Sequence, residues 1–281
     1  MERVGVVGSG TMGAGIAQVV AEAGYRVYVS DVTDQALDRG LGQIRSLLSK
    51  GVDRAKITQE EAEGVLGRIE SGADLQGHAD ADLVIEAVFE DMRVKKELFS
   101  RLERICKATA LFATNTSSLC VTEMAAATSR PAQVVGMHFF NPASVMKLVE
   151  VVRTVHTSEE TFQSAWAFAE SLGKEPIASE DRAGFVVDRI LIPYLMEAVR
   201  SLQEGVASME DIDKGMKLGC GFPMGPFTLM DLIGLDICCN AAMTLYEEFR
   251  ERSFSPPPLL RRMVQAGWLG RKTGRGFYKY D

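Results

Sequence analysis

The sequence lacks the features that mark secreted and membrane proteins. It has only five cysteines, an odd number with one adjacent pair and no CxxC spacing, so we expect reduced thiols buried as small apolar groups. No apolar run reaches the roughly 18 residues of a membrane span. Residues 1–7 have a strand pattern and not that of a signal peptide. These observations predict a cytoplasmic protein outside the membrane. The cysteines are Cys106, Cys120, Cys220, Cys238 and Cys239.

Basic residues are also in the minority. The chain has 31 Lys and Arg against 38 Asp and Glu, a formal net charge of −7, and so acidic a protein is a poor candidate for nucleic-acid binding. An anionic ligand would need a local basic patch. Metal-ligand spacings and the GxSxG and HExxH motifs are absent from the sequence, so metal-dependent hydrolysis and acyl transfer lack support.

The length and the order of the expected elements predict two domains. A single core rarely grows past roughly 250 residues, and this chain has 281. Strand and helix patterns alternate over the first half, whereas the part after the EDRAG stretch at 180–184 is mostly helical. We predict an α/β fold with a Rossmann-type domain over residues 1–183. An all-α domain should follow over residues 184–281.

A glycine fingerprint follows the first predicted strand, residues 3–7. Gly8 would allow the tight turn, Gly10 would let the backbone approach a pyrophosphate, and Gly13 would allow close packing of helix on strand. Thr11 and Met12 complete the turn and open a helical pattern that runs to residue 23. The free N–H groups and positive dipole end of this helix would face the phosphates.

The next strand pattern, residues 25–30, ends at Asp31, which follows Gly13 by 18 residues. A carboxylate there can accept hydrogen bonds from the ribose hydroxyls of NAD and would repel the 2′-phosphate of NADP. The sequence therefore predicts NAD as the cofactor, with NADP disfavoured. The alternative is a glycine turn beside an unrelated surface aspartate, which this spacing disfavours.

Residues 35–68 predict a helical hairpin inserted in the first domain, longer than a simple crossover requires. Thr58 and Glu61 have the spacing of a capping box at the start of its second helix. Lys50, Arg54 and Lys56 lie close together in the sequence between the two helices. They form either a phosphate-binding patch or an ordinary solvated helix end, and spacing alone does not decide between these interpretations.

Polar residues follow the other predicted strands of the first domain, residues 83–86 and 111–114. Ligands of open α/β sheets bind at the carboxyl ends of the strands, so Glu90, Lys95, Asn115 and Ser117 are candidates for the cofactor cleft. For Ser117 a second interpretation, a turn or N-cap serine, is the better one on position alone.

His138 differs from the other two histidines because apolar residues surround it. We expect His78 and His156 to face solvent, whereas His138 lies in VVGMHFFNP, residues 134–142. A histidine in such a run is often only structural. However, a second strand pattern, LVEVV at 148–152, buries Glu150, and a buried carboxylate needs a partner. Glu150 would orient the His138 ring and stabilise its cation, an arrangement suited to exchanging an alcohol and a ketone beside a nicotinamide.

Several motifs resemble those of one family over nearly the whole chain. They are GSGTMGAGIAQ at 8–18, NTSS at 115–118, HFFNP at 138–142, GFVV at 184–187, GP at 225–226 and KTGRGFYK at 272–279. The chain resembles the bacterial members of the L-3-hydroxyacyl-CoA dehydrogenase family. The resemblance implies NAD-dependent interconversion of a short-chain L-3-hydroxyacyl-CoA, such as 3-hydroxybutyryl-CoA, and the 3-ketoacyl-CoA.

The resemblance also implies roles for the candidate residues. His138 would be the acid/base, Glu150 its partner and Ser117 a hydrogen-bond partner of the substrate oxygen. The cofactor would contact Glu90, Lys95, Asn115 and Asn141, and also Lys272 in the last motif. The phosphates of coenzyme A would bind Lys50, Arg54 and Lys56, which favours the patch interpretation of the hairpin.

Position 188 departs from the family pattern. The family has Asn in the run after GFVV, an amide that can donate a hydrogen bond to the substrate carbonyl, and this chain has Asp188. Two alternatives to the acyl-CoA activity stay open: a dehydrogenase of a free hydroxy acid on the same scaffold, or, because of Asp188, a catalytically weak NAD-binding or structural homologue. We also expect a homodimer through the second domain, which is too apolar for a lone small bundle.

Overall fold

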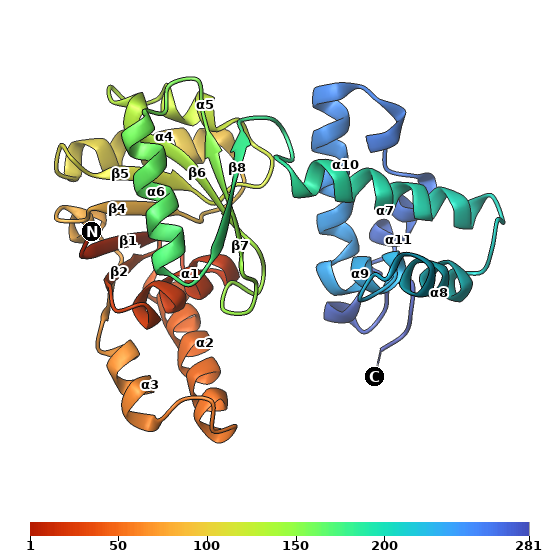
Figure 1. Cartoon of the computed structure of the whole chain (residues 1–281), viewed down its shortest axis with the longest axis horizontal. Helices are drawn as coiled ribbons and strands as arrows, with labels where there is room; N and C mark the ends of the chain where they lie inside the picture. The colour runs from red at the N-terminus through yellow and green to blue at the C-terminus, as the bar shows by residue number, and fades with distance from the viewer. Residues whose placement is uncertain (281) are drawn as a thin grey trace. The chain divides into compact units, whose positions relative to one another are not determined.

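The computed structural model describes residues 1–280 and separates into two compact units. The first spans Met1–Arg182 and the second begins at Ala183. The first unit is built on one sheet and the second is helical, so the predicted fold class is confirmed (Figure 1).

Eight strands form the sheet of the first unit in the order β3-β2-β1-β4-β5-β6-β7-β8. All neighbours pair in parallel except β6 and β7, which are antiparallel. The first six strands have the order of a Rossmann fold, in which a dinucleotide binds where the order reverses, between β1 and β4. The strands are β1 (Arg3–Val7), β2 (Arg26–Ser30), β3 (Ile69–Gly72), β4 (Leu83–Glu86), β5 (Leu111–Thr114), β6 (Val134–Phe139), β7 (Leu148–Arg153) and β8 (Glu175–Glu180).

Helices cover both faces of this sheet because alternate strand residues are apolar on each side. Helices α1 and α6 pack on one face with the strand residues of the main core, and α4 and α5 pack on the other, where Phe99 meets Phe112 edge to face (Figure 1). The helices are α1 (Thr11–Glu22), α2 (Asp34–Asp53), α3 (Gln59–Leu66), α4 (Met92–Ile105), α5 (Val121–Ala125) and α6 (Glu159–Ser171), with short 3₁₀ turns at Leu75–His78 and Pro131–Gln133.

The predicted helical hairpin corresponds to α2 and α3. Thr58 Oγ1 accepts from the Glu61 N–H, and the Glu61 carboxylate accepts from the Thr58 N–H, so the predicted capping box is present. Strand β3, which follows the hairpin, was missed because Ile69 is the single large apolar residue in its IESG sequence. Its pairing with β2 therefore depends on the neighbouring strand more than on its own pattern.

The second unit packs its apolar residues between α7, α9, α10 and α11. Two buried carboxylates tie the end of the described chain to this core. Asp231 accepts from the N–H groups of Phe277 and Tyr278, and Asp213 accepts from the Tyr278 hydroxyl. The helices are α7 (Val187–Gln203), α8 (Met209–Cys220), α9 (Pro226–Ile233), α10 (Leu235–Phe249) and α11 (Pro258–Gln265), with 3₁₀ turns at Arg252–Phe254 and Arg271–Thr273.

Over residues 1–280, no single helix is both long and apolar enough to cross a membrane. Helices α9 and α10 reach that length and apolarity only when counted together, across a bend of 98°.

Candidate active site

The glycine turn after β1 has the geometry that a bound dinucleotide requires. Gly8 has φ +98°, and a side chain at Gly13 would collide with the Gly8 carbonyl, so both positions need glycine. Around Gly10 the space is open, with no atom within 4 Å of an added Cβ. Gly10 is also the N-cap of α1 and offers no side-chain cap, so the first N–H groups of the helix, from Thr11 and Met12 onward, have no side-chain acceptor there.

Asp31, at the end of β2, is tied to the same turn. Its Oδ2 accepts from both the N–H and the hydroxyl of Ser9 at 2.7 Å, and its Oδ1 accepts from the Val32 N–H. Gly8 N–H donates to the Ser30 carbonyl at 2.7 Å, which fixes the end of β2 against the turn. Asp31 therefore lies beside the glycine turn, the position of the carboxylate that binds the ribose hydroxyls in a dinucleotide site.

The end of β4 holds a buried charge cluster. Lys95 is 1% exposed, and its ammonium lies 2.6 Å from Glu86 Oε1 and 3.0 Å from Glu90 Oε2. Thr114 Oγ1 donates to Glu86, and Thr116 Oγ1 donates to Glu90. Lys95 is thus fixed by two carboxylates inside the unit, and Glu90 is the half-exposed member of the cluster that faces solvent at the sheet edge.

His138 and Glu150 occupy opposite positions in the antiparallel pair β6 and β7. His138 Nδ1 lies 2.7 Å from Glu150 Oε2, and Glu150 is completely buried. Because a carboxylate can only accept, Nδ1 carries the proton and Nε2 is the nitrogen that exchanges a proton with a ligand. The Phe140 ring lies 4.5 Å from the imidazole, centroid to centroid, and limits its orientation.

Asn115 connects the end of β5 to the residue after His138. Its Oδ1 accepts from the Phe139 N–H at 2.8 Å. Ser117 is half-buried in the turn that follows, and the side chain that organises this turn is Thr116, which accepts from the Ser118 and Leu119 N–H groups. Sequence reasoning missed Thr116 because its partners become clear only when the turn is folded.

Asn141 is exposed in the loop after β6, at the same edge of the sheet. Strands β1, β2, β4, β5 and β6 are parallel, so the residues that follow them all lie at their common carboxyl edge. The fold therefore brings together, at this carboxyl edge, candidate residues of the first unit that the sequence predicted. They are Gly8, Gly10, Gly13, Asp31, Glu90, Lys95, Asn115, Ser117, His138 and Asn141.

Two family models match the chain. The NAD binding domain of 3-hydroxyacyl-CoA dehydrogenase matches residues 3–182, and the C-terminal domain of the same enzyme matches residues 184–280. The chain belongs to the 3-hydroxyacyl-CoA dehydrogenase family. Its first unit is an NAD-binding domain, and the open space at Gly10, the uncapped start of α1 and the Asp31 carboxylate fit that cofactor.

Relatives and solved structures match this dehydrogenase from end to end. A probable 3-hydroxybutyryl-CoA dehydrogenase of Deinococcus radiodurans is 50% identical, covering 99% of this chain and 100% of the relative. Human mitochondrial hydroxyacyl-coenzyme A dehydrogenase is 44% identical, covering 100% of this chain and 91% of the relative. The crystal structure of FadB2 of Mycobacterium tuberculosis superposes with a TM-score of 0.98 at 46% identity, covering 100% of this chain and 99% of that one.

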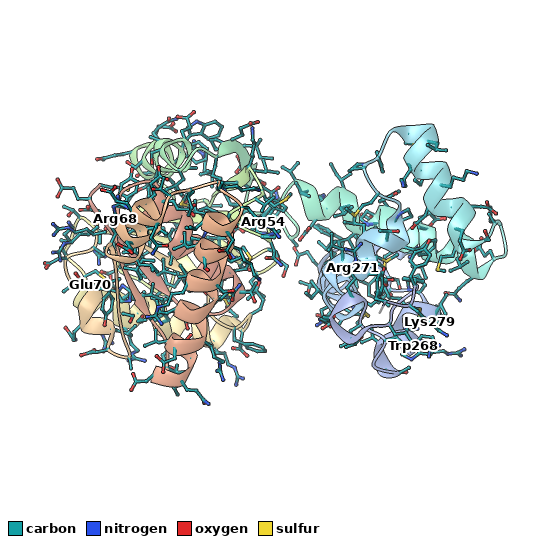
Figure 2. All side chains as sticks on the ribbon, turned by 90° about the horizontal axis from the view of Figure 1, so that it is seen from below. Arg54, Arg68, Glu70, Trp268, Arg271 and Lys279 are labelled. Atoms are coloured by element: carbon teal, nitrogen blue, oxygen red, sulfur yellow. The ribbon has the colours of Figure 1, made fainter. Side chains whose placement is uncertain are left out.

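The basic residues of the hairpin lie at its end. Lys50, Arg54 and Lys56 are all exposed, with Arg54 on the outside of the first unit in Figure 2. The backbone brings them together, since the Arg54 N–H donates to the Lys50 carbonyl and the Lys56 N–H to the Gly51 carbonyl. The dehydrogenase therefore has a compact group of three cations on an otherwise acidic chain.

The remaining candidates of the dehydrogenase belong to its second unit. Asp188 is half-buried in the first turn of α7. Lys272 donates to both oxygens of Asp236, at 2.6 and 2.7 Å, so its charge is already paired within the unit.

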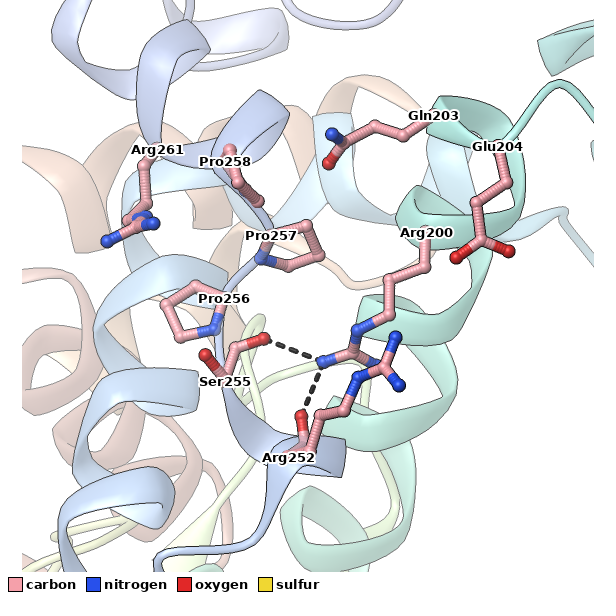
Figure 3. Close-up of a pocket in the computed structure, with 9 residues that line it drawn as sticks. All are labelled: Arg200, Gln203, Glu204, Arg252, Ser255, Pro256, Pro257, Pro258 and Arg261. Carbon is pink, nitrogen blue, oxygen red and sulfur yellow. Dashed lines mark hydrogen bonds between the residues drawn. The ribbon is translucent and has the colours of Figure 1, made fainter.

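A cavity of about 450 Å³ also opens in the second unit (Figure 3). The Arg200 guanidinium donates to the carbonyls of Arg252 and Ser255, which fixes the wall of the cavity. Its lining has no histidine, so it lacks the paired imidazole and carboxylate found at the sheet edge. The lining residues are Arg200, Gln203, Glu204, Arg252, Ser255, Pro256, Pro257, Pro258 and Arg261.

Two expectations about single residues were wrong. His78 is completely buried, with its Nε2 2.7 Å from Ser30 Oγ and its ring edge to face with Tyr28, and burial lowers the pKa of His78 to about 4. Cys120 and Cys220 are exposed, whereas the other three thiols are buried. His156 is exposed, as expected. Among residues 1–280, no three His, Cys, Asp or Glu side chains are arranged to hold a metal ion.

Proposed function

We propose that this chain catalyses the NAD-dependent interconversion of L-3-hydroxybutyryl-CoA and acetoacetyl-CoA. The proposal rests on the buried contact of 2.7 Å between His138 Nδ1 and Glu150 Oε2 at the edge of an NAD-binding sheet. Support for the substrate comes from relatives, since the proteins of Deinococcus radiodurans and Clostridioides difficile that it resembles are named for 3-hydroxybutyryl-CoA.

In the oxidative direction His138 acts as the general base. Its Nε2 accepts the proton of the 3-hydroxyl group while the carbon–oxygen bond gains double-bond character. NAD, when bound, supplies the chemistry by accepting the hydride that leaves carbon 3. Glu150 keeps the proton on Nδ1 and stabilises the positive charge that the ring acquires. The carboxylate is buried away from water, so its negative charge acts strongly on the imidazole. In the reductive direction His138 returns the proton.

The turn after β5 positions the substrate oxygen. Ser117 is the half-exposed hydroxyl in that turn, and its donation to the oxygen would stabilise the charge that develops there. Asn115 helps to fix this region by accepting from the Phe139 N–H, next to His138. Asn141 has an exposed amide at the same edge, where it would contact the nicotinamide of bound NAD.

The three cations of the hairpin fit a coenzyme A thioester better than a free acid. Lys50, Arg54 and Lys56 project from its end into solvent, where phosphates of a long ligand can reach them. A small hydroxy acid has no comparable group for these side chains to bind. The hairpin therefore favours the thioester over a free hydroxy acid as substrate.

Oxidation of NADH, followed by absorbance with acetoacetyl-CoA and separately with free acetoacetate, tests the proposal. We expect rapid turnover of the thioester and little turnover of the acid. Turnover of free acids alone would favour the alternative dehydrogenase. Binding of NADH without turnover of either compound would indicate a weak homologue and would reject the proposed activity.

We further propose a homodimer formed through the second unit. Its surface has several large apolar side chains that are costly to leave in water, among them Ile190 at 68% and Ile237 at 52% exposure. Light scattering on the purified protein at micromolar concentration tests this, and a monomer mass would reject it. The expected cytoplasmic location stays a prediction, which fractionation of the source cells would test.

A further inference from the structure

The loop that follows the catalytic strand β6 lies against the cofactor helix α1. This loop, residues 141–147, starts at Asn141, and all its residues except Ala143 are exposed. Ala143 is 4% exposed, and its Cβ would lie 3.2 Å from a Cβ added at Gly15. Gly15 is about one helical turn past Gly10 and Thr11. The loop therefore packs beside the N-terminal end of α1, which would face the pyrophosphate of bound NAD.

The ammonium group of Lys174 holds this loop in place. Lys174 Nζ donates to the Ala143 carbonyl at 2.6 Å and to the Met146 carbonyl at 2.9 Å. These acceptors lie 31 and 28 residues away in the sequence. Lys174 has an anchored backbone of its own, since its N–H donates to the Ala169 carbonyl at the end of α6.

The rest of the loop has few fixed contacts. The N–H groups of Val145 and Met146 both donate to the Pro142 carbonyl, which closes a local turn but does not attach it to the sheet. The Lys174 bonds join this turn to the connection between α6 and β8. Hydrogen bonds to a charged donor are stronger than those between neutral groups. Without Lys174 the Ala143 and Met146 carbonyls would accept hydrogen bonds from water instead. The loop would keep the bond from the Glu175 N–H to the Lys147 carbonyl at its end but would lose the attachment of its middle.

We propose that Lys174 is a positioning residue for the cofactor. It holds loop 141–147 against α1, so that Asn141 and the N-terminus of α1 keep the spacing that bound NAD requires. The inference rests on the proposed role of Asn141 and deepens the proposed function. Lys174 makes no contact with the reacting atoms in this scheme and acts only through the loop.

Loss of Lys174 should weaken cofactor binding more than it slows proton transfer. His138 and Glu150 are held opposite each other by the β6 and β7 register and by their own hydrogen bond, and neither depends on Lys174. The basic residues of the hairpin are likewise on another element. Loss of Lys174 should therefore weaken NADH binding while the KM for the acyl-CoA stays nearly constant.

Three variants test this. Lys174→Met keeps the length of the side chain and removes the donors, Lys174→Arg keeps the charge and the donors, and Lys147→Met is the matched control. Lys147 lies at the end of the same loop. Its side chain is 77% exposed, and its Nζ forms a loose surface ion pair with Glu175 Oε1 at 3.6 Å. NADH affinity is measured by fluorescence titration, together with kcat, the KM of each substrate and the melting temperature.

We expect Lys174→Met to raise the Kd for NADH by about tenfold, with the KM for acetoacetyl-CoA changed less than about twofold. Lys174→Arg should restore most of the affinity, and Lys147→Met should resemble the parent protein. Hydrogen exchange provides a second measurement. The amides of Val145 and Met146 should exchange faster in Lys174→Met, and those of β6 and β7 should not.

An unchanged NADH affinity in Lys174→Met would overturn the proposal. An equal loss of every kinetic parameter with a lowered melting temperature and no rescue by Arg would also overturn it, because it would show a purely structural role. The NADH titration needs no turnover. If the parent protein fails to reduce acetoacetyl-CoA, the proposed function fails while the Lys174 proposal is still decided by NADH binding.

Discussion

Glu150 lies directly opposite His138 in the antiparallel pair of β6 and β7, with its Oε2 2.7 Å from the Nδ1 of the imidazole. The backbone register alone brings the two side chains to the same face of the sheet, because directly paired residues point the same way. The carboxylate is completely buried, so the imidazole is its compensating group.

Replacing the carboxylate should therefore impair proton transfer. We expect Glu150→Gln to lower kcat by roughly a hundredfold to ten-thousandfold, because the amide can stabilise the wrong imidazole tautomer and does not compensate its cation. NADH affinity should be unchanged. Stopped-flow turnover of acetoacetyl-CoA and NADH titration measure the two effects. Glu70→Gln, at an exposed position of β3, is the control, and a kcat within twofold of the parent for Glu150→Gln would contradict the mechanism.

Charge removal at the hairpin should weaken thioester binding. We expect Lys50→Gln, Arg54→Gln and Lys56→Gln each to raise the KM for acetoacetyl-CoA by up to about fivefold, the range of an exposed ion pair. The effect should shrink as salt is added, since exposed charges are screened. Steady-state kinetics at two ionic strengths measures it. Arg101→Gln, an exposed position on α4, is the control, and equal KM values in all four variants would argue against the patch.

The sequence predicted the parts of this enzyme that local patterns determine. The turn at Gly8 and Gly13 follows from the conformations that glycine alone tolerates, and the pairing of His138 with Glu150 follows from two adjacent strand patterns, each with a buried polar residue. The hairpin followed from helical periodicity and from the capping box at Thr58. These features need only the identities of nearby residues and the cost of burying charge.

The features that were missed depend on contacts between distant segments. His78 lies in a polar stretch that resembles a solvent-exposed loop, but its 3₁₀ turn packs the ring against Ser30 and Tyr28 of β2. Lys174 looks like an ordinary surface lysine until the 141–147 loop is folded beside it. Strand β3 forms because its backbone pairs with that of β2. No local pattern encodes such long-range partners.

Position 188 allows a gain of activity to be tested. An ionised carboxylate accepts hydrogen bonds but cannot donate one, whereas an amide can donate to a developing oxyanion. We expect Asp188→Asn to raise kcat by about tenfold to a thousandfold, the size of one missing oxyanion donor. Turnover of both proteins under the same conditions measures this. Equal turnover of the two proteins would show that the side chain at position 188 has no such role, even when it is an amide.

The buried ion pair of Lys95 with Glu86 should matter for stability. Both side chains are 1% exposed, and removal of one partner leaves an uncompensated charge in the interior. We expect Lys95→Met to lower the free energy of unfolding by about 3–5 kcal/mol. The double variant Lys95→Met with Glu86→Gln should recover part of the loss. Urea unfolding of the parent protein and the two variants measures this, and an unchanged midpoint for Lys95→Met would contradict the pairing.

Burial of His78 should make stability depend on pH. Its pKa is about 4 in the folded protein against 6.5 for the exposed residue, so between these values the unfolded chain binds more protons than the folded one. The contribution of His78 is complete above pH 6.5 and is lost as the pH falls to about 4, with a total of about 3 kcal/mol.

The free energy of unfolding in urea, measured between pH 7 and pH 4.5, should therefore fall more steeply for the parent than for His78→Gln. His156→Gln removes an exposed imidazole and should keep the parent's slope. Identical slopes for the parent and His78→Gln would show that His78 does not stay neutral in the folded protein over this range.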